Sequence, residues 1–114
     1  MKEIKFRTWD INEKKMGKVI TIGSFVTTKE NCPDCEIMQF TGLKDSEDVE
    51  IWEGDVVRVC IEQLFDDVEK VGIVIYDAPA FKIDFPDEGV TIGIVDEYSM
   101  SVIGNIYENP ELLK

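Results

Sequence analysis

Several short segments of the chain alternate apolar and polar positions with a period of two, and this pattern predicts strands rather than helices. Near the beginning, apolar Ile4 and Phe6 alternate with polar residues, and β-branched content resumes over residues 16–26. The polar stretch between them favours a turn, so residues 3–9 and 16–26 are expected to form a hairpin or a pair of neighbouring strands. A further short strand is expected at residues 37–41, which end at Gly42.

The clearest strand pattern lies in the middle of the chain, at residues 56–61, 71–76 and 81–85. A Gly-Asp turn at residues 54–55 precedes the first of these segments, the second contains a glycine, and the third alternates strictly and is aromatic. By analogy, this order is similar to that of small SH3-like barrels.

The connection at residues 61–68 fits two structures. Its apolar residues recur at the spacing of one helical face, but a strand extension with a turn at Asp66-Asp67 fits equally. The hairpin is preferred because a helix of about nine residues is marginal in isolation.

The end of the chain predicts two more strands, at residues 90–95 and 101–107, followed by a short helical turn. Asn109 is a suitable N-cap, Pro110 fits the first helical position, and Glu111 suits the positive end of the helix dipole.

The fold class expected from these elements is mainly β. It comprises an N-terminal β-hairpin, a small SH3-like β-barrel and a short C-terminal helical turn. The length of 114 residues predicts one domain over residues 1–114, with the N-terminal strands in 1–41 and the barrel-like part in 42–114. No apolar run is long enough to span a membrane, and the charged start lacks a secretion signal.

The net charge of −12 is unevenly distributed. Residues 1–18 hold six basic and three acidic side chains, whereas residues 19–114 hold six basic and twenty-one acidic ones. Such an acidic body disfavours binding to nucleic acid and to anionic membranes. The preferred interpretation is that a basic hairpin docks on the acidic body, and the alternative is a basic patch that binds nucleic acid.

The composition also disfavours an enzyme. The chain has no histidine, which removes the commonest general base and the Ser–His and Cys–His nucleophile arrangements, and it has no phosphate-binding loop. With twenty-four acidic residues, clusters of carboxylates arise by chance, and most are expected in solvated turns. We expect no catalytic residues and no cofactor.

Two cysteines, Cys32 and Cys35, form the sharpest local motif. Their spacing suits half of a zinc site or a redox pair, but a zinc site normally takes four protein ligands, and Cys60 falls in a strand predicted to be buried. An incidental pair of loop cysteines is therefore preferred, and metal binding or a reversible disulfide stays an alternative.

Lys5, Arg7 and Trp9 share one face of the first predicted strand. Cations interleaved with an aromatic ring suit single-stranded nucleic acid. The preferred interpretation is that Trp9 packs on a neighbouring strand or subunit while the two cations cover it or pair with acids. These three residues are candidate binding residues, together with Gly54 and Asp55, beside whose turn a binding groove is a hypothesis.

Three parts of the chain, taken together, resemble the YopX family of small phage and prophage proteins. They read IKFRTWD at residues 4–10, MQFTGLKD at 38–45 with IWEGDVV at 51–57, and VIGNIYENPELL at 102–113. The resemblance implies a mainly β protein encoded by a phage or prophage, acting in the bacterial cytoplasm and able to self-associate. It brings no activity and no catalytic residues.

The function expected from these observations is that of a non-enzymatic accessory protein, a β domain that binds another protein or itself as a homo-oligomer. One version is an acidic surface that occupies the nucleic-acid groove of a host protein. The alternatives are a nucleic-acid-binding module that uses the basic hairpin and, least favoured, a metal-assisted hydrolase.

Overall fold

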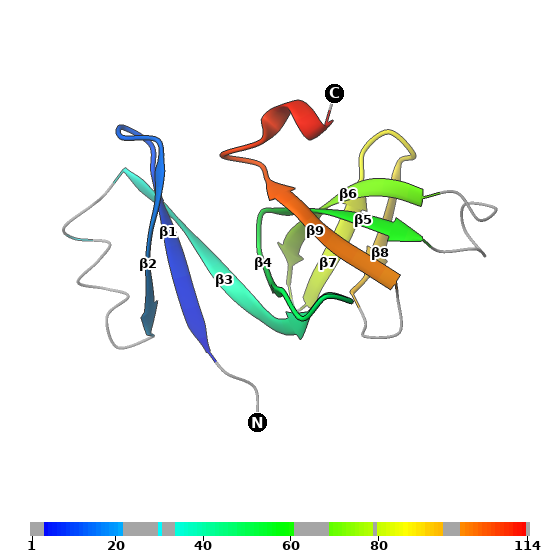
Figure 1. Ribbon diagram of the computed structural model, residues 1–114, viewed down its shortest axis with the longest axis horizontal. Helices are drawn as coiled ribbons and strands as arrows, with labels where there is room; N and C mark the ends of the chain where they lie inside the picture. Colours follow the sequence, from blue (N-terminus) through cyan, green and yellow to red (C-terminus); the bar gives the residue numbers. More distant parts are fainter. Residues whose placement is uncertain are drawn as a thin grey trace.

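A computed structural model describes residues 4–21, 30, 34–60, 69–78, 80–94 and 99–113, and it shows a mainly β protein, as the sequence predicts. The described strands form two antiparallel sheets (Figure 1). The first sheet has the strand order β2-β1-β3-β4. Its strands are β1 (Lys5–Asp10), β2 (Lys15–Thr21), β3 (Cys35–Lys44) and β4 (Glu50–Trp52).

The predicted hairpin is confirmed for the described residues, in which β1 pairs with β2. Its turn is closed by Asp10, whose carboxylate accepts the backbone N–H groups of Asn12 and Glu13 and whose carbonyl accepts that of Lys14. Lys14 takes a positive φ of 56° at this tip. Residues 22–26 of the second predicted strand lie outside the described residues.

Strand β3 is longer than predicted, because Gly42 does not end it. Gly42 takes a φ of 89°, and the pairing with β4 is irregular between Phe40 and Lys44, so the strand continues through a bulge. The hydroxyl of Thr41 donates to the carbonyl of Ile51 at this point. As a result, β3 reaches from the hairpin to the second sheet (Figure 1).

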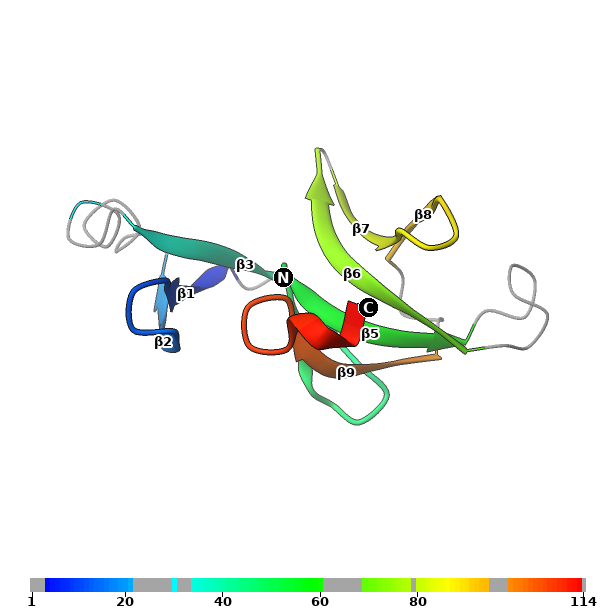
Figure 2. The same cartoon turned by 90° about the horizontal axis from the view of Figure 1, so that it is seen from above.

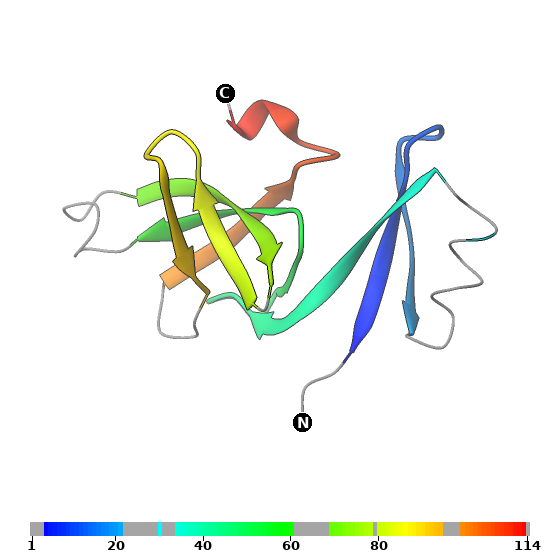
Figure 3. The same ribbon diagram turned by 180° about the vertical axis from the view of Figure 1, so that it is seen from behind.

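The second sheet has the order β8-β7-β6-β5-β9. Its strands are β5 (Asp55–Cys60), β6 (Glu69–Asp77), β7 (Ala80–Phe85), β8 (Val90–Gly93) and β9 (Ser99–Asn105). The first four form a meander, and β9 returns to pair with β5 (Figure 3). The predicted SH3-like barrel is not confirmed. Among the described residues no strand closes the sheet, because short β8 pairs only with β7 and β9 only with β5.

The core follows the predicted alternation and lies mainly within the second sheet, with Ile51 of β4 added from the first. Ile83 and Phe85 of β7 are buried, while Phe81 on the same strand is only half-buried and packs edge-on against Tyr76. The glycine of the middle strand, Gly72, lets β7 approach, since a Cβ there would lie 2.6 Å from Ile83 and 2.9 Å from Phe85. The core cluster comprises Ile51, Val57, Val59, Val74, Ile83, Phe85 and Met100.

The predicted C-terminal helical turn is confirmed as a 3-10 helix, η2 (Pro110–Leu113). Asn109 directly precedes this helix, as predicted for a cap, and its carbonyl accepts the backbone N–H of Leu112. Its side-chain oxygen accepts the backbone N–H of Asn105 at 3.3 Å, so the side chain closes the turn that follows β9 and does not bond to η2. That turn also ends β9 at Asn105, two residues earlier than predicted.

The ambiguous segment 61–68 lies outside the described residues, as do residues 95–98. Within the described part of the chain, no helix is long and apolar enough to cross a membrane.

Candidate functional site

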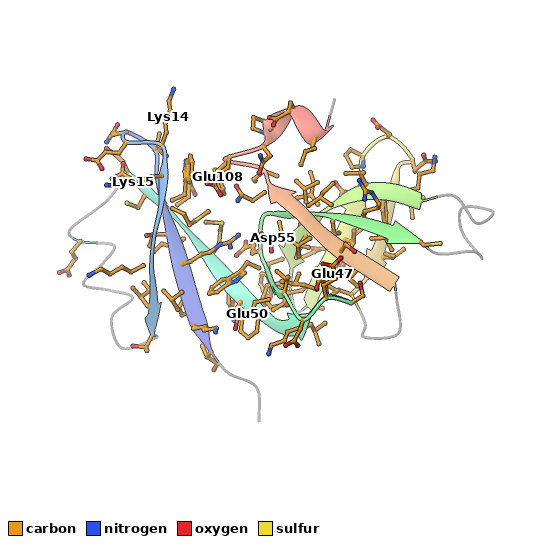
Figure 4. All side chains as sticks on the ribbon, viewed as in Figure 1. Lys14, Lys15, Glu47, Glu50, Asp55 and Glu108 are labelled. Carbon is orange, nitrogen blue, oxygen red and sulfur yellow. The ribbon has the colours of Figure 1, made fainter. Side chains whose placement is uncertain are left out.

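The two sheets meet at a seam built around one buried ion pair. Arg7 of β1 donates from Nη2 to Oδ1 of Asp55, the first residue of β5, at 2.5 Å. The other carboxylate oxygen, Oδ2, accepts the backbone N–H of Trp52 at 2.7 Å. The Asp55 side chain is 2% exposed and lies between the hairpin and the second sheet (Figure 4). The guanidinium Nε of Arg7 is buried and has no hydrogen-bond partner in the described structure.

Aromatic rings complete the surroundings of the two cations. The guanidinium of Arg7 lies 5.0 Å from the centre of the Trp52 ring. The ammonium of Lys5 lies 4.7 Å from the centre of the Phe40 ring and forms an ion pair with Glu50 at 2.5 Å. Cations over aromatic faces are attracted by the ring quadrupole, more strongly when water is excluded. The basic hairpin is thus docked on acidic residues of the body, as the preferred interpretation of the charge distribution expected.

Burial raises the pKa of Asp55 to about 6. The positive charge of Arg7 and the N–H of Trp52 act in the opposite direction, because both favour the ionised carboxylate. Desolvation exceeds these two effects. The free-energy cost of keeping the Asp55 side chain ionised in the seam therefore depends on pH.

The other candidate residues also lie at the seam. Trp9 is 7% exposed and stacks on Tyr107, with ring centroids 5.6 Å apart. Gly54 takes a φ of 88° in the turn between β4 and β5, donates its N–H to the carbonyl of Val74 and accepts the N–H of Ile106. The structure therefore brings Arg7, Trp9, Gly54 and Asp55 to one contact between the sheets, where their interactions support the fold. Lys5, the fifth candidate, lies beside this contact, on Phe40, Glu50 and Trp52 of its own sheet.

Next to this seam the two sheets diverge and leave a hollow of about 220 Å³. In Figure 2, β3 extends from the centre of the molecule toward the left while β6 rises toward the top, so the two strands point apart. One wall comes from β3, the other from β6, and the floor from the turn at Gly54 and the residues after β9. The residues that line it include Glu36, Ile37, Glu53, Ile75, Tyr76 and Tyr107. We call this hollow the groove.

The sequence pattern indicated the Gly54 end of the groove but missed the residues of its walls. The pattern predicts Tyr107 at the end of a strand, but its contact is a stack on Trp9, almost a hundred positions away. Glu36 and Tyr76 gave no signal, because an exposed acid and an exposed aromatic residue are ordinary in strands. Their proximity follows from the angle between the sheets, which the pattern does not encode.

Neither Cys35 nor Cys60 lines the groove. Cys35 is buried at the start of β3 and is disulfide-bonded, whereas Cys60 at the end of β5 is free. Cys32 lies outside the described residues, so the predicted pair is only half described. A sulfur in a disulfide is not a thiolate and cannot serve as a metal ligand in that state. The described part of the chain contains no group of three or more acidic or cysteine side chains placed to hold a metal ion.

These features define a class of protein in which a β-hairpin sheet and a five-stranded sheet share a polar seam and enclose a groove. The family model described as YopX protein matches residues 18–114, and the chain therefore belongs to the YopX family. Two of the three resembling parts lie within the matched residues, and the segment at residues 4–10 precedes them.

Two solved structures share this fold. The chain is similar to protein EF1440 from Enterococcus faecalis, with 25% sequence identity and a TM-score of 0.66 over 100% of both chains. It is also similar to protein yopX from Bacillus subtilis, with 16% identity and a TM-score of 0.61 over 96% of this chain and 98% of that chain. No curated protein matches the chain.

Proposed function

We propose that this YopX-family chain is a non-enzymatic accessory protein of a phage or prophage, acting in the bacterial cytoplasm as a β domain that binds another protein or itself. The phage origin and the location rest on the resemblance of the sequence to the family. The binding role rests on one observation, the groove between two sheets that are fixed to each other by buried polar contacts.

A rigid concavity is what a binding domain requires, because a preformed site loses little conformational freedom when its partner arrives. The Arg7–Asp55 pair and the stack of Trp9 on Tyr107 join the sheets directly beside the groove. These contacts within the protein thus keep the two walls of the groove apart, so the groove forms without a partner.

The alternative function, nucleic-acid binding by the hairpin, is weakened by the placement of its candidate residues. The side chains of Lys5 and Arg7 are 16% and 17% exposed, and each is paired with an acidic residue. A phosphate would have to displace these acids. Only the exposed cations of the hairpin, such as Lys14 at its tip, point away from the body (Figure 4).

The first test combines sedimentation of the purified protein with capture of partners from lysates of a bacterial host, prepared with and without prophage induction. We expect either a defined homo-oligomer or a stoichiometric protein partner that persists after nuclease treatment. A monomer that captures only nuclease-sensitive material would contradict the proposal.

A variant with Lys14→Glu and Lys18→Glu separates the two functions. Both residues are exposed on the hairpin, so reversing their charge leaves the seam intact. If the chain bound nucleic acid through the hairpin, this variant would lose binding and its salt dependence. We expect capture of the protein partner, or self-association, to be retained.

A further inference from the structure

The groove combines negative charge with apolar walls. Glu36 projects from β3, Glu53 precedes Gly54, and both carboxylates act with burial to raise the pKa of Tyr107, burial being the largest cause. Neither carboxylate forms an ion pair with a cation within the described structure. The Oε1 of Glu53 accepts the backbone N–H of Gln39 at 3.2 Å, which leaves its second oxygen for a ligand. Such a site is complementary to a cation.

The wall formed by β3 has an open backbone edge. The carbonyl of Gln39 accepts the N–H of Glu53, so the backbone groups of Gln39 point away from β1. Alternate residues of a strand direct these groups to the same side, and Ile37 therefore presents its N–H and C=O in the same direction. Strand β4 pairs with β3 only from Phe40 onward, and no described strand pairs with Ile37 on this side, which is opposite to its pairing with Thr8 of β1.

The wall formed by β6 has a matching open edge. The carbonyl of Val74 accepts the N–H of Gly54, so Val74 directs its backbone groups away from β7. By the same alternation, Tyr76 presents its N–H and C=O on that side. Strand β5 pairs with β6 only as far as Ile73, and the described structure places no strand on this side of Tyr76, whose other side pairs with Phe81 of β7.

The dimensions of the groove suit a peptide better than a small molecule. Its volume of about 220 Å³ is below the range of roughly 300–1,000 Å³ typical of small-molecule pockets. Beyond Tyr76 a second hollow of about 460 Å³ follows, lined by Leu43, Phe81 and Ile94 among others. Since Tyr76 lines both hollows, one extended segment can occupy them in succession.

We propose that the groove binds an extended segment of a partner protein by β-strand addition, with a lysine or arginine side chain between Glu36 and Glu53. Hydrogen bonds to the open backbone edges at Ile37 and Tyr76 hold the segment, and the two carboxylates select its basic residue. An apolar side chain further along the segment enters the second hollow. This inference rests on the proposed protein-binding function and names the partner's chemistry.

The test uses capped peptides of alternating valine and threonine with one central lysine, arginine or methionine, titrated into the intact protein. We expect the lysine and arginine peptides to bind roughly tenfold more tightly than the methionine peptide, because each charged hydrogen bond is strong in a partly buried site. Equal affinity for the three peptides, or no measurable binding of any of them, would overturn the inference.

Two variants with the same change of net charge locate the cation. Glu36→Lys reverses a charge in the groove, and Glu47→Lys reverses one in the turn between β3 and β4, at the other end of β3 (Figure 4). Both residues are exposed, so neither change disturbs the core. We expect Glu36→Lys to abolish the preference for the basic peptides and Glu47→Lys to leave it. Equal effects would show that general attraction to an acidic protein explains the binding.

Glu53→Gln provides a milder variant that keeps an oxygen to accept the N–H of Gln39. It should weaken the lysine peptide while leaving the methionine peptide unchanged. Amide hydrogen exchange then tests the strand addition, since the bound peptide should slow exchange at Ile37 and Tyr76. Unchanged exchange at both amides would overturn the proposed mode of binding.

Failure of this inference and failure of the proposed function give different results. If the peptides do not bind but the protein captures a partner equally well with Glu36→Lys, the inference is wrong and protein binding stands. If neither peptides nor partners bind and the protein is monomeric, both are wrong. A homo-oligomer disrupted by Glu36→Lys but not by Glu47→Lys would assign the groove to a second copy of the chain and overturn the foreign partner.

Discussion

The interior of the five-stranded sheet is built from aliphatic and aromatic side chains, whereas the seam between the two sheets is built around charged ones. In the core cluster, residues such as Val57 and Phe85 are almost completely buried and need only fill space. At the seam, Asp55 is buried to the same extent but depends on Arg7 and on the N–H of Trp52. Both regions exclude water. The contacts of the seam, in contrast to those of the core, depend on the direction of hydrogen bonds and on the protonation state of Asp55.

The difference has a consequence for the groove. Apolar contacts tolerate small shifts, so an apolar seam would allow the sheets to slide. The carboxylate of Asp55 accepts hydrogen bonds from two donors in fixed positions, which fixes one arrangement of the two sheets. The geometry of the adjacent groove follows from that arrangement. The buried Nε of Arg7 lacks a hydrogen-bond partner, so this fixed arrangement of the sheets lowers the stability of the folded state to some extent.

The largest effect is expected in the core. Phe85→Ala should lower the free energy of unfolding by about 4 kcal/mol, because it removes apolar contacts and leaves a cavity. Val71→Ala, on an exposed position of β6, should change it by about 0.5 kcal/mol or less and serves as the control. Urea unfolding measures both. A loss of stability at Phe85 no greater than at Val71 would contradict the assignment of the core.

Removal of one partner of the Arg7–Asp55 ion pair should lower the free energy of unfolding more than removal of both. Asp55→Ala leaves the charge of Arg7 buried without a partner and should cost about 3 kcal/mol of unfolding free energy. The double variant Arg7→Met with Asp55→Ala should recover much of that loss, since no uncompensated charge remains. Urea unfolding of the two single variants and the double variant completes the cycle. Strictly additive losses would show that the pair does not act as a unit.

A change of pH distinguishes the two regions, because among their described residues only the seam contains a buried titrating group. Since the folded pKa of Asp55, about 6, lies above its ordinary value, the folded state binds this proton more tightly than the unfolded chain. The contribution of Asp55 to stability is therefore greatest below about pH 4 and declines as the pH rises to 6, by on the order of 2 kcal/mol.

Asp55→Asn isolates this contribution from those of the other carboxylates. The amide cannot titrate, so the difference in unfolding free energy between the wild type and the variant should change between pH 4 and 6. An NMR titration of the Asp55 carboxyl should give a midpoint near 6. A midpoint below 4 would mean that the charge of Arg7 outweighs burial.

The same contrast explains what the sequence could predict. Alternation of apolar residues at 81–85 correctly identified β7 and its buried face. Successive side chains of a strand point to opposite faces, so burial of one face produces an apolar residue at every second position. The face of Lys5, Arg7 and Trp9 was also found, together with its preferred role in pairing with acids. Their partners could not be named, since nothing in a local pattern connects Arg7 to Asp55, 48 positions away.

At some positions, the same residue is compatible with more than one local structure. Gly42 looks like a strand end, but the same positive φ serves a bulge that lets β3 continue. Asn109 looks like a helix cap, but its oxygen finds the N–H of Asn105 in the preceding turn. Closure of the sheet was inferred from an order of strands, and strand order does not determine whether β8 and β9 meet. The groove walls depend on such long-range geometry throughout.

The smallest effect is expected at the rim of the seam, where Lys5 meets Glu50. Lys5→Met keeps an unbranched side chain over the Phe40 ring but removes the charge, and it should cost about 1 kcal/mol or less. Glu50 is 35% exposed, so salt screens this pair, and the difference between Lys5→Met and the wild type should shrink in 1 M sodium chloride. The loss caused by Asp55→Ala should persist there, because salt does not reach a carboxylate that is 2% exposed. Equal salt sensitivity of the two variants would show that water reaches the whole seam, and the contrast between rim and centre would then be wrong.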